Sequence, residues 1–329
     1  MYNMRNVIPF WKFPKKEVYI LLNKQCRKSL IENAIEGTSS KNYYDLALIL
    51  NKASKKYNLK RKFNGGDIKR WLDGENKDSR TNIIHPKFIP LWAVVELKRH
   101  TKIKLEVLEK EIIGYKSGTR GKIISNPKLP IRINPEFDSL IIHLFADGYV
   151  NNKISSPSYC QKNEGDRELF INKLKNSFGD FKGTLVENKV IRFPKVITRI
   201  LSNHYNIPSY MSKEAVIPKE ILDKNKKYKL ACIIAFILDE GNIKDCICCF
   251  STNKIMLSQI RQLFQDCGYE CNPIRDSPKV SWFGMKNRFV NEFYRDIIKF
   301  KELYPNCSLG TKNERLHRLF LKPRRFQRI

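Results

Sequence analysis

The chain has 329 residues, with 62 Lys and Arg against 33 Asp and Glu, so its formal net charge is +29. A content of 42% hydrophobic and 29% charged residues is typical of a globular protein and excludes a disordered chain. So large an excess of cations favours nucleic acid as the partner, because each neutralised phosphate releases counterions.

No apolar stretch reaches the roughly 18 to 20 residues that a membrane span needs. The start of the chain, MYNMRNVIPFWKFPKK, also lacks the continuous apolar segment of a signal peptide. We therefore expect a cytoplasmic protein that contacts no membrane. The nine cysteines are irregularly spaced, and we interpret them as reduced core residues, including the group Cys246, Cys248 and Cys249.

Residues 1–115 are predicted to form a mostly helical domain. Apolar side chains recur at helical spacing in four segments, and Ser, Asp and Gly residues mark several of the ends: 16–37, 39–57, 65–75 and 89–101. The pair DIKRWLDG and IPLWAVVEL resembles the third and fourth helices of repressor-type helix-turn-helix domains. That resemblance implies a DNA-binding module in which Lys69 and Arg70 face the duplex. A helical bundle used only for packing is the alternative.

Residues 116–133 are predicted to be a basic linker. The segment KSGTRGKIISNPKLPIR holds five basic residues and no acid, and Gly, Ser and Pro interrupt it. Such a segment, with Arg120 in its first half, is suited to lie along phosphates.

From residue 134 onward one pattern of elements occurs twice. Each copy begins with an apolar helix and continues with two strands, an amphipathic helix, two more strands and a closing helix. We predict half 1 over 134–208, a joining segment over 209–226, half 2 over 227–311 and a basic tail over 312–329. The fold class is therefore α+β, with two pseudo-symmetric αββαββα halves that contain antiparallel sheets and follow a helical domain.

The two apolar helices end in the same way, with LIIHLFADG at 140–148 and IIAFILDEG at 233–241. If the halves pack about a pseudo-twofold axis, these helices pair there and bring Asp147 and Glu240 together. Two carboxylates at helix C-terminal ends repel each other and oppose the helix dipoles, so a divalent cation between them would be stabilising. Mg²⁺ suits such a pair, with Mn²⁺ as the alternative. Gly148 and Gly241 would let the chain turn from helix into strand.

This arrangement resembles the LAGLIDADG homing endonucleases of the single-chain, two-motif type, over residues 134 to 300. The resemblance implies sheets that form a saddle over the DNA major groove and Mg²⁺-dependent cleavage of both strands of an asymmetric site by a monomer. It implies that Asp147 and Glu240 hold the metal, while a metal-activated water attacks the phosphodiester. His143, inside the first motif, is expected to be a packing or interface residue.

Further roles follow from the same resemblance by position. Lys195 and Lys286 would help to polarise water or stabilise charge, and Gln161 and Asn253 would orient water. Side chains of the first hairpin in each half would read bases, and the candidates are Tyr149, Asn151, Lys153, Asn242 and Lys244.

Two alternatives to the nuclease remain. In the motifs, Phe145 and Leu238 replace the usual inner Asp, and Ile142 stands where the family has a small residue at the helix contact. A wider contact could displace the carboxylates, which favours a regulator that binds double-stranded DNA without cutting it. A net charge of +29 suits RNA equally well, so an RNA maturase of the same family is the other alternative.

Overall fold

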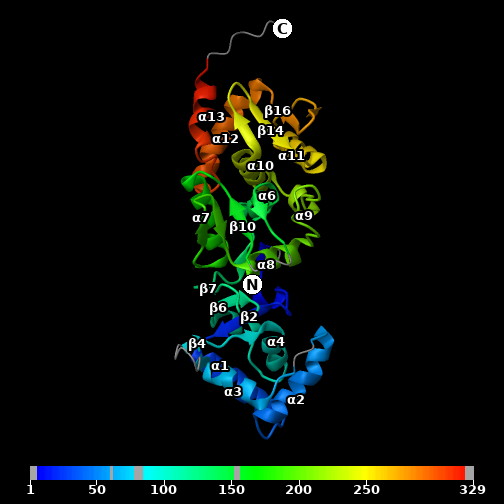
Figure 1. Ribbon diagram of the computed structural model, residues 1–329, viewed down its shortest axis with the longest axis vertical. Coiled ribbons are helices and arrows are strands. Elements are labelled where there is room, and N and C mark those ends of the chain that lie inside the picture. Colours follow the sequence, from blue (N-terminus) through cyan, green and yellow to red (C-terminus); the bar gives the residue numbers. More distant parts are fainter. Residues whose placement is uncertain (1–5, 60–61, 78–83, 152–155, 323–329) are drawn as a thin grey trace. The chain divides into compact units, whose positions relative to one another are not determined.

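The computed structural model describes residues 6–59, 62–77, 84–151 and 156–322, and the chain forms two compact units. Unit 1 contains Met1–Arg132, Phe178–Lys182 and Pro194–His204, and unit 2 contains Ile133–Ser177, Gly183–Phe193 and Tyr205–Ile329. The class is α+β, and every pair of strands in the described residues is antiparallel (Figure 1).

Unit 1 combines helices with a four-stranded sheet of order β5-β2-β6-β7. Its helices are α1 (Lys24–Gly37), α2 (Tyr43–Ser54), α3 (Gly65–Asp73), α4 (Leu91–Arg99) and α5 (Leu105–Lys110), with 3-10 turns η2 (Phe10–Lys12) and η3 (Lys55–Tyr57). Its strands are β1 (Val7–Ile8), β2 (Val18–Leu22), β3 (Glu75–Lys77), β4 (Ile84–Pro86), β5 (Ile89–Pro90), β6 (Ile112–Ser117), β7 (Ile124–Ser125) and β8 (Ile131–Arg132). Helix α8 (Lys195–Tyr205) also belongs to this unit except for its last residue.

The continuous helix predicted over 16–37 is wrong in its first part. Residues Val18–Leu22 form the strand β2, whose side chains alternate between buried and half-buried positions, as the two-residue period of a strand requires. The helix α1 begins only after Asn23, whose side chain accepts a hydrogen bond from the Cys26 N–H at 2.8 Å and so caps it. Five consecutive β-branched, aromatic and leucine residues fit a half-buried sheet better than a helix.

The segment 116–133 is also more regular than the linker we predicted. It contains the end of β6 and the strands β7 and β8, and β8 pairs with β1 near the start of the chain. Likewise the predicted helix pair DIKRWLDG and IPLWAVVEL is interrupted, because β3, β4 and β5 lie between α3 and α4. Unit 1 therefore contains the predicted helical region together with a sheet that the apolar spacing did not indicate.

Unit 2 contains the two copies of the repeat, apart from α8. The first copy runs α6 (Pro135–Ala146), β9 (Gly148–Tyr149), β10 (Ser158–Cys160), α7 (Glu164–Phe178), β11 (Thr184–Val186), β12 (Val190–Arg192) and then α8. The second runs α10 (Lys226–Glu240), β13 (Gly241–Ile243), β14 (Ile247–Ser251), α11 (Lys254–Asp266), β15 (Arg275–Asp276), β16 (Ser281–Gly284), η4 (Asn287–Phe289) and α12 (Val290–Leu303). Helix α9 (Lys219–Leu222) lies between the copies and α13 (Lys312–Leu321) follows them.

The two sheets of unit 2 share one topology. Their strand orders are β9-β10-β12-β11 and β13-β14-β16-β15, so in both the first strand of the copy lies at one edge and the hairpins meet in the middle. The expected order of helix, two strands, helix, two strands and helix is therefore present in both copies. In the first copy, the hairpin turn at Glu187 and Asn188 uses left-handed backbone at both residues, as a two-residue turn requires.

The helices α6 and α10 pack against each other at the centre of unit 2 (Figure 1). Residues 135–145 of α6 and 230–238 of α10 are all buried. A helix that is apolar on all sides is stable only inside a core, which explains why these two helices pair with each other. Helix α6 begins with Asn134 as N-cap and Pro135 in its first turn.

The glycines that follow these helices are required by crowding and not by left-handed backbone. A Cβ at Gly148 would lie 2.3 Å from the Leu144 carbonyl oxygen, and one at Gly241 would lie 2.6 Å from the Ile237 carbonyl oxygen. Gly241 has an ordinary extended backbone with φ −94° and ψ 158°. We expected these glycines to ease the turn from helix into strand. The structure gives the specific reason: the strand begins so close to the last helical turn that a Cβ at Gly148 or Gly241 would not fit.

All nine cysteines are free, and five of them are buried, whereas Cys160 is exposed. The prediction that the cysteines are core residues is therefore correct for these five and wrong for the other four. Within the described ranges, no helix combines the length and apolar character that a bilayer crossing requires.

Replacing Gly241 by Ala should lower the free energy of unfolding by about 1–3 kcal/mol, because the Ile237 carbonyl or the strand must move. Gly165→Ala is the matched control, since a Cβ there would have only the Asn163 side chain nearby, at 3.4 Å. Urea denaturation of both variants measures the difference. Equal stability of the two variants would contradict the crowding that we describe.

Candidate functional site

The C-terminal ends of α6 and α10 bring two carboxylates together. Asp147 is the C-cap residue of α6, and its N–H donates to the His143 carbonyl at 3.0 Å. Glu240 is the last residue of α10. Both residues are half-buried, and the negative charge of Asp147 acts directly on Glu240. The packing of α6 against α10 and the charge interaction are compatible with one site, and that the two acids share it stays a prediction.

Burial and neighbouring negative charge both disfavour ionisation at this site. Burial, followed by the charge of Asp239, raises the pKa of Asp147 to about 7. Burial, followed by the charges of Asp147 and Asp239, raises the pKa of Glu240 to about 7. The C-terminal ends of the two helices add further negative potential. Without a cation, the site therefore holds its negative charge at a cost in free energy.

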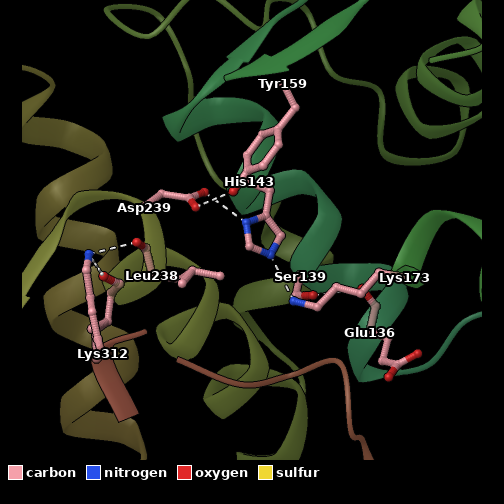
Figure 2. Close-up of polar contacts among 9 residues, drawn as sticks. Glu136, Ser139, His143, Tyr159, Lys173, Leu238, Asp239 and Lys312 are labelled. Carbon is pink, nitrogen blue, oxygen red and sulfur yellow. Dashed lines mark hydrogen bonds and ion pairs between the residues drawn. The ribbon is translucent and has the colours of Figure 1, made fainter. Parts of the chain in front are cut away.

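Asp239 is the third acid of the site and its side chain is fully buried (Figure 2). One oxygen accepts a hydrogen bond of 2.6 Å from the Tyr159 hydroxyl, and the other lies 2.8 Å from Nδ1 of His143. Burial raises the pKa of Asp239 to about 7, although Tyr159, Lys173 and Lys312 oppose that shift. The residue before Glu240 is thus a structural acid inside the core and not a second surface ligand.

His143 connects Asp239 to a buried lysine. Nζ of Lys173 lies 2.8 Å from Nε2 of His143, and both side chains are completely buried (Figure 2). Lysine can only donate, so Nε2 accepts and the proton on Nδ1 is donated to Asp239. Burial and the positive charge of Lys173 hold the pKa of His143 well below its usual value, which keeps the ring neutral.

This chain of hydrogen bonds links four elements: α7 supplies Lys173, α6 supplies His143, α10 supplies Asp239 and β10 supplies Tyr159. The Tyr159 and Phe170 rings stack with centroids 4.1 Å apart and cover the network on one side. We refer to Lys173, His143, Asp239 and Tyr159 as the buried network. It crosses from the first copy of the repeat to the second, so it fixes α10 against α6 immediately behind the acid pair.

Lys312 closes the end of α10 from the other side. Its Nζ donates to the carbonyl oxygens of Ile237, Leu238 and Gly241, each at 2.7 Å. Figure 2 shows Lys312 beside Leu238. The Ile237 carbonyl also accepts the Gly241 N–H, so the ammonium group adds a second donor at the end of the helix and opposes the helix dipole. Burial lowers the pKa of Lys312, while the charges of Asp239, Asp166 and Asp147 raise it. The positive charge of Lys312 in turn lowers the pKa of Asp147, Asp239 and Glu240, so it acts on all three acids.

The sequence analysis did not identify Asp239, Tyr159, Lys173 or Lys312 as site residues. Lys312 was counted only as a basic residue of the tail, whereas residues 312–321 form the helix α13. His143, expected as a packing or interface residue, does bridge α6 and α10. The sequence does contain a histidine inside an apolar helix, His143, and a second acid directly before Glu240, Asp239. Neither feature indicates that these two residues bind each other.

The other predicted catalytic lysines have different surroundings. Lys195 is the first residue of α8, which belongs to unit 1, and partial burial and Arg199 lower its pKa. Lys286 forms an ion pair of 2.6 Å with Glu270, which also pairs with Arg288.

The two predicted water-orienting residues differ from each other. The Gln161 side chain reaches the Tyr159 hydroxyl, so it lies next to the buried network. Asn253 is buried and caps α11 by accepting from the Met256 N–H, while its amide group donates to the carbonyls of Ser212 and Ala215 at 2.8 Å. Its side chain is therefore used for structure.

The residues predicted to contact DNA are exposed wherever the structure describes them. In unit 2 these are Tyr149, Asn151, Asn242 and Lys244, whereas Lys153 lies outside the described residues. Tyr149 and Asn242 lie on β9 and β13, the edge strands that directly follow the acids. In unit 1, Lys69, Arg70 and Arg120 are exposed, and Arg70 pairs with Asp67 at 2.7 Å.

The acid pair suits a hard divalent cation. In the part of the chain that the structure describes, no three His, Cys, Asp or Glu side chains converge to enclose a metal ion. A pair of carboxylates is nevertheless a sufficient protein contribution for Mg²⁺, which keeps several waters and takes phosphate oxygens. A cation would relieve the repulsion that Asp239 exerts on Asp147 and that Asp147 and Asp239 exert on Glu240, so the residues present fit Mg²⁺ or Mn²⁺.

No protein-family model and no curated protein matches the chain. Among solved structures, the chain is similar to the homing endonuclease I-DmoI in complex with DNA and Ca, at 14% identity over 50% of this chain and 88% of that chain, with a TM-score of 0.36. A mesophilic variant of I-DmoI gives 14% identity over 50% and 96%, with a TM-score of 0.36. A third structure, an I-DmoI variant with its nicked target DNA and Mn, gives 14% identity over 50% and 96%, with a TM-score of 0.38. The fold described above rests on the strand orders and helix pairing of this chain itself.

The raised pKa values predict a pH-dependent stability in the absence of divalent cations. Between about pH 4 and 7 the folded protein holds more protons at Asp147 and Glu240 than the unfolded chain does, so the free energy of unfolding falls as the pH rises. Asp147→Asn removes one titrating group and its repulsion on Glu240. The free energy of unfolding of this variant should therefore fall less steeply with pH than that of the wild type. Chemical denaturation in a chelator at about pH 5 to 8 gives the two curves. Parallel curves would show that Asp147 does not titrate with a raised pKa in the folded protein.

The buried network predicts a large penalty for removing its lysine. Lys173→Met should cost about 3 kcal/mol or more of unfolding free energy, because Asp239 loses a compensating cation and Nε2 of His143 loses its hydrogen-bond donor. Lys175→Met on the same helix is the matched control, because that side chain is half-buried and no partner is identified for it. Its effect should stay within about 0.5 kcal/mol. Thermal and urea unfolding measure both, and a similar effect of the two substitutions would contradict the network.

Proposed function

We propose that this protein is a DNA endonuclease that hydrolyses phosphodiester bonds in duplex DNA with the help of Mg²⁺. The observation that carries the proposal is the acid pair, Asp147 and Glu240, held at the ends of two buried helices that start two copies of one topology. Paired carboxylates in a strongly cationic chain are suited to hold a divalent cation against phosphate.

Each named residue would have a limited task in this proposal. Asp147 from the first copy and Glu240 from the second would hold the cation. When bound, Mg²⁺ lowers the pKa of a water molecule and neutralises charge on the leaving oxygen. Lys312 holds the end of α10 in place through its three carbonyl contacts. The buried network would keep the two carboxylates at a fixed separation, which matters because metal sites tolerate little displacement.

DNA would lie against the two antiparallel sheets of unit 2. The edge strands β9 and β13 follow the acids directly, so a phosphate at the acid pair places neighbouring bases next to these strands. Exposed Tyr149, Asn242 and Lys244 are the candidates for base and phosphate contacts. The two halves differ in sequence at these positions, so we expect an asymmetric target site.

A second candidate function is a DNA-binding protein that does not cut. Two of the predicted auxiliary residues are used elsewhere, since Lys286 pairs with Glu270 and Asn253 caps α11. Without such groups the acid pair could still bind a cation and a phosphate but would polarise water less effectively. This observation favours binding alone over binding followed by hydrolysis. RNA binding by the same cationic chain is a further outcome that the experiment below distinguishes.

Asp147→Asn and Glu240→Gln should each reduce cleavage by roughly a thousandfold or more, because several kcal/mol of charge stabilisation depend on the cation. Binding to the same DNA should change little. Cleavage of a library of genomic DNA fragments with Mg²⁺ or Mn²⁺, followed by sequencing of the ends, measures the activity, and gel shift measures the affinity. Glu302→Gln, an exposed acid at the end of α12, is the control.

The outcomes separate the candidates. Discrete double-strand breaks that both site variants lose support the nuclease. Salt-sensitive specific DNA binding without breaks supports the regulator, and preference for structured RNA over duplex DNA supports a maturase. Unchanged cleavage by Asp147→Asn would refute the assigned site.

A further inference from the structure

Unit 1 contains a pocket that the proposed nuclease activity does not use. Its volume is about 490 Å³, and its walls come from β2, β4, α3 and the segment between β6 and β7. Ligand pockets in proteins typically measure about 300–1,000 Å³, so this one is large enough for one small organic molecule and too small for a folded protein segment. The residues named below lie within unit 1.

The deep part of the pocket is aromatic. Tyr19, Phe63, Trp71 and Phe88 line it, and the last three are 8%, 2% and 5% exposed. The Phe63 and Trp71 ring centroids lie 5.1 Å apart, so these two rings form one contiguous apolar surface. Rings held rigidly in this way favour a flat aromatic ligand, because little side-chain freedom is lost on binding.

The rim of the pocket is cationic. Lys87, Lys116 and Arg120 line it together with His85, and no Asp or Glu is among the described residues that line it. Nζ of Lys116 lies 4.5 Å from the centre of the Phe88 ring and donates to the Thr119 carbonyl at 2.7 Å. Burial and the charge of Lys87 lower the pKa of Lys116, so these two cations repel each other across the pocket. An anion placed between them would remove that cost.

We propose that this pocket binds one nucleotide, with the base against Tyr19 and Trp71 and the phosphate at Lys116 and Arg120. An aromatic floor beneath a cationic rim matches a ligand that is flat and apolar at one end and anionic at the other. The nucleotide is either free in solution or part of a single-stranded nucleic acid. The proposal is independent of cleavage at Asp147 and Glu240.

The test uses the full-length protein in a chelator, so that hydrolysis does not interfere. Calorimetric titration with adenosine and uridine monophosphate, a short 5′-phosphorylated single strand and a blunt duplex gives the affinity for each probe. Binding of the monophosphates identifies a free nucleotide as sufficient, and binding of the single strand alone identifies nucleic acid as the source. We expect Lys116→Gln and Arg120→Gln each to weaken this binding about tenfold, and Lys116→Arg to restore most of it.

Lys102→Gln is the matched control, because Lys102 is an exposed lysine of unit 1 that does not line the pocket. It should bind like the wild type. Equal losses in Lys102→Gln and Lys116→Gln would overturn the proposal in favour of general electrostatic attraction. So would an absence of binding by all nucleotide probes, or equally tight binding of an acidic peptide. Arg120 is exposed, so its variant tests the pocket even if Lys116→Gln does not fold.

Discussion

Two like charges held at the ends of a buried helix pair are the constraint on which the rest of unit 2 depends. The apolar surfaces of α6 and α10 leave these helices no stable position except against each other, and their pairing brings Asp147 and Glu240 into one electrostatic environment. Burial and the charge of Asp239 then raise the pKa of Asp147 to about 7, and burial with the charges of Asp147 and Asp239 does the same for Glu240. The charged pair by itself lowers the stability of the fold. A bound cation would neutralise the two carboxylates and remove that cost, and the pair would then be a binding site.

The surroundings of the pair are built to hold position. Lys312 occupies three carbonyls at the end of α10, and the buried network ties α7, α6, α10 and β10 together behind the acids. Lys173 and Lys312 lower the pKa of Asp239, whose side chain is buried in the core. Asp147 and Glu240 are half-buried, so their carboxylates are partly exposed to solvent. The division is physically sensible, because the inner acid fixes geometry while the outer two remain available to a ligand.

Sequence reasoning succeeded where the signal is local and repeated. Two motifs of equal form and a repeated order of elements predicted the two αββαββα copies and the packing of their first helices. It failed for Lys173, Tyr159 and Lys312, because these residues reach the site from other segments and no spacing rule connects them with the motifs. In unit 1 it failed because Val18–Leu22 also fits helical spacing, and only pairing with β6 and β5 selects the strand. Gly148 and Gly241 were expected from the motifs. The reason that no side chain fits there, a close helix carbonyl, depends on the three-dimensional path of the chain and has no sequence signal.

The claim that Asp147 and Glu240 form one cation site is tested most directly by titrating the protein with Mn²⁺ and counting bound ions by electron paramagnetic resonance. The account predicts one site that both Asp147→Asn and Glu240→Gln eliminate, and that the double variant weakens no further. Loss of different sites in the two variants, or Mn²⁺ binding that neither substitution alters, would contradict it.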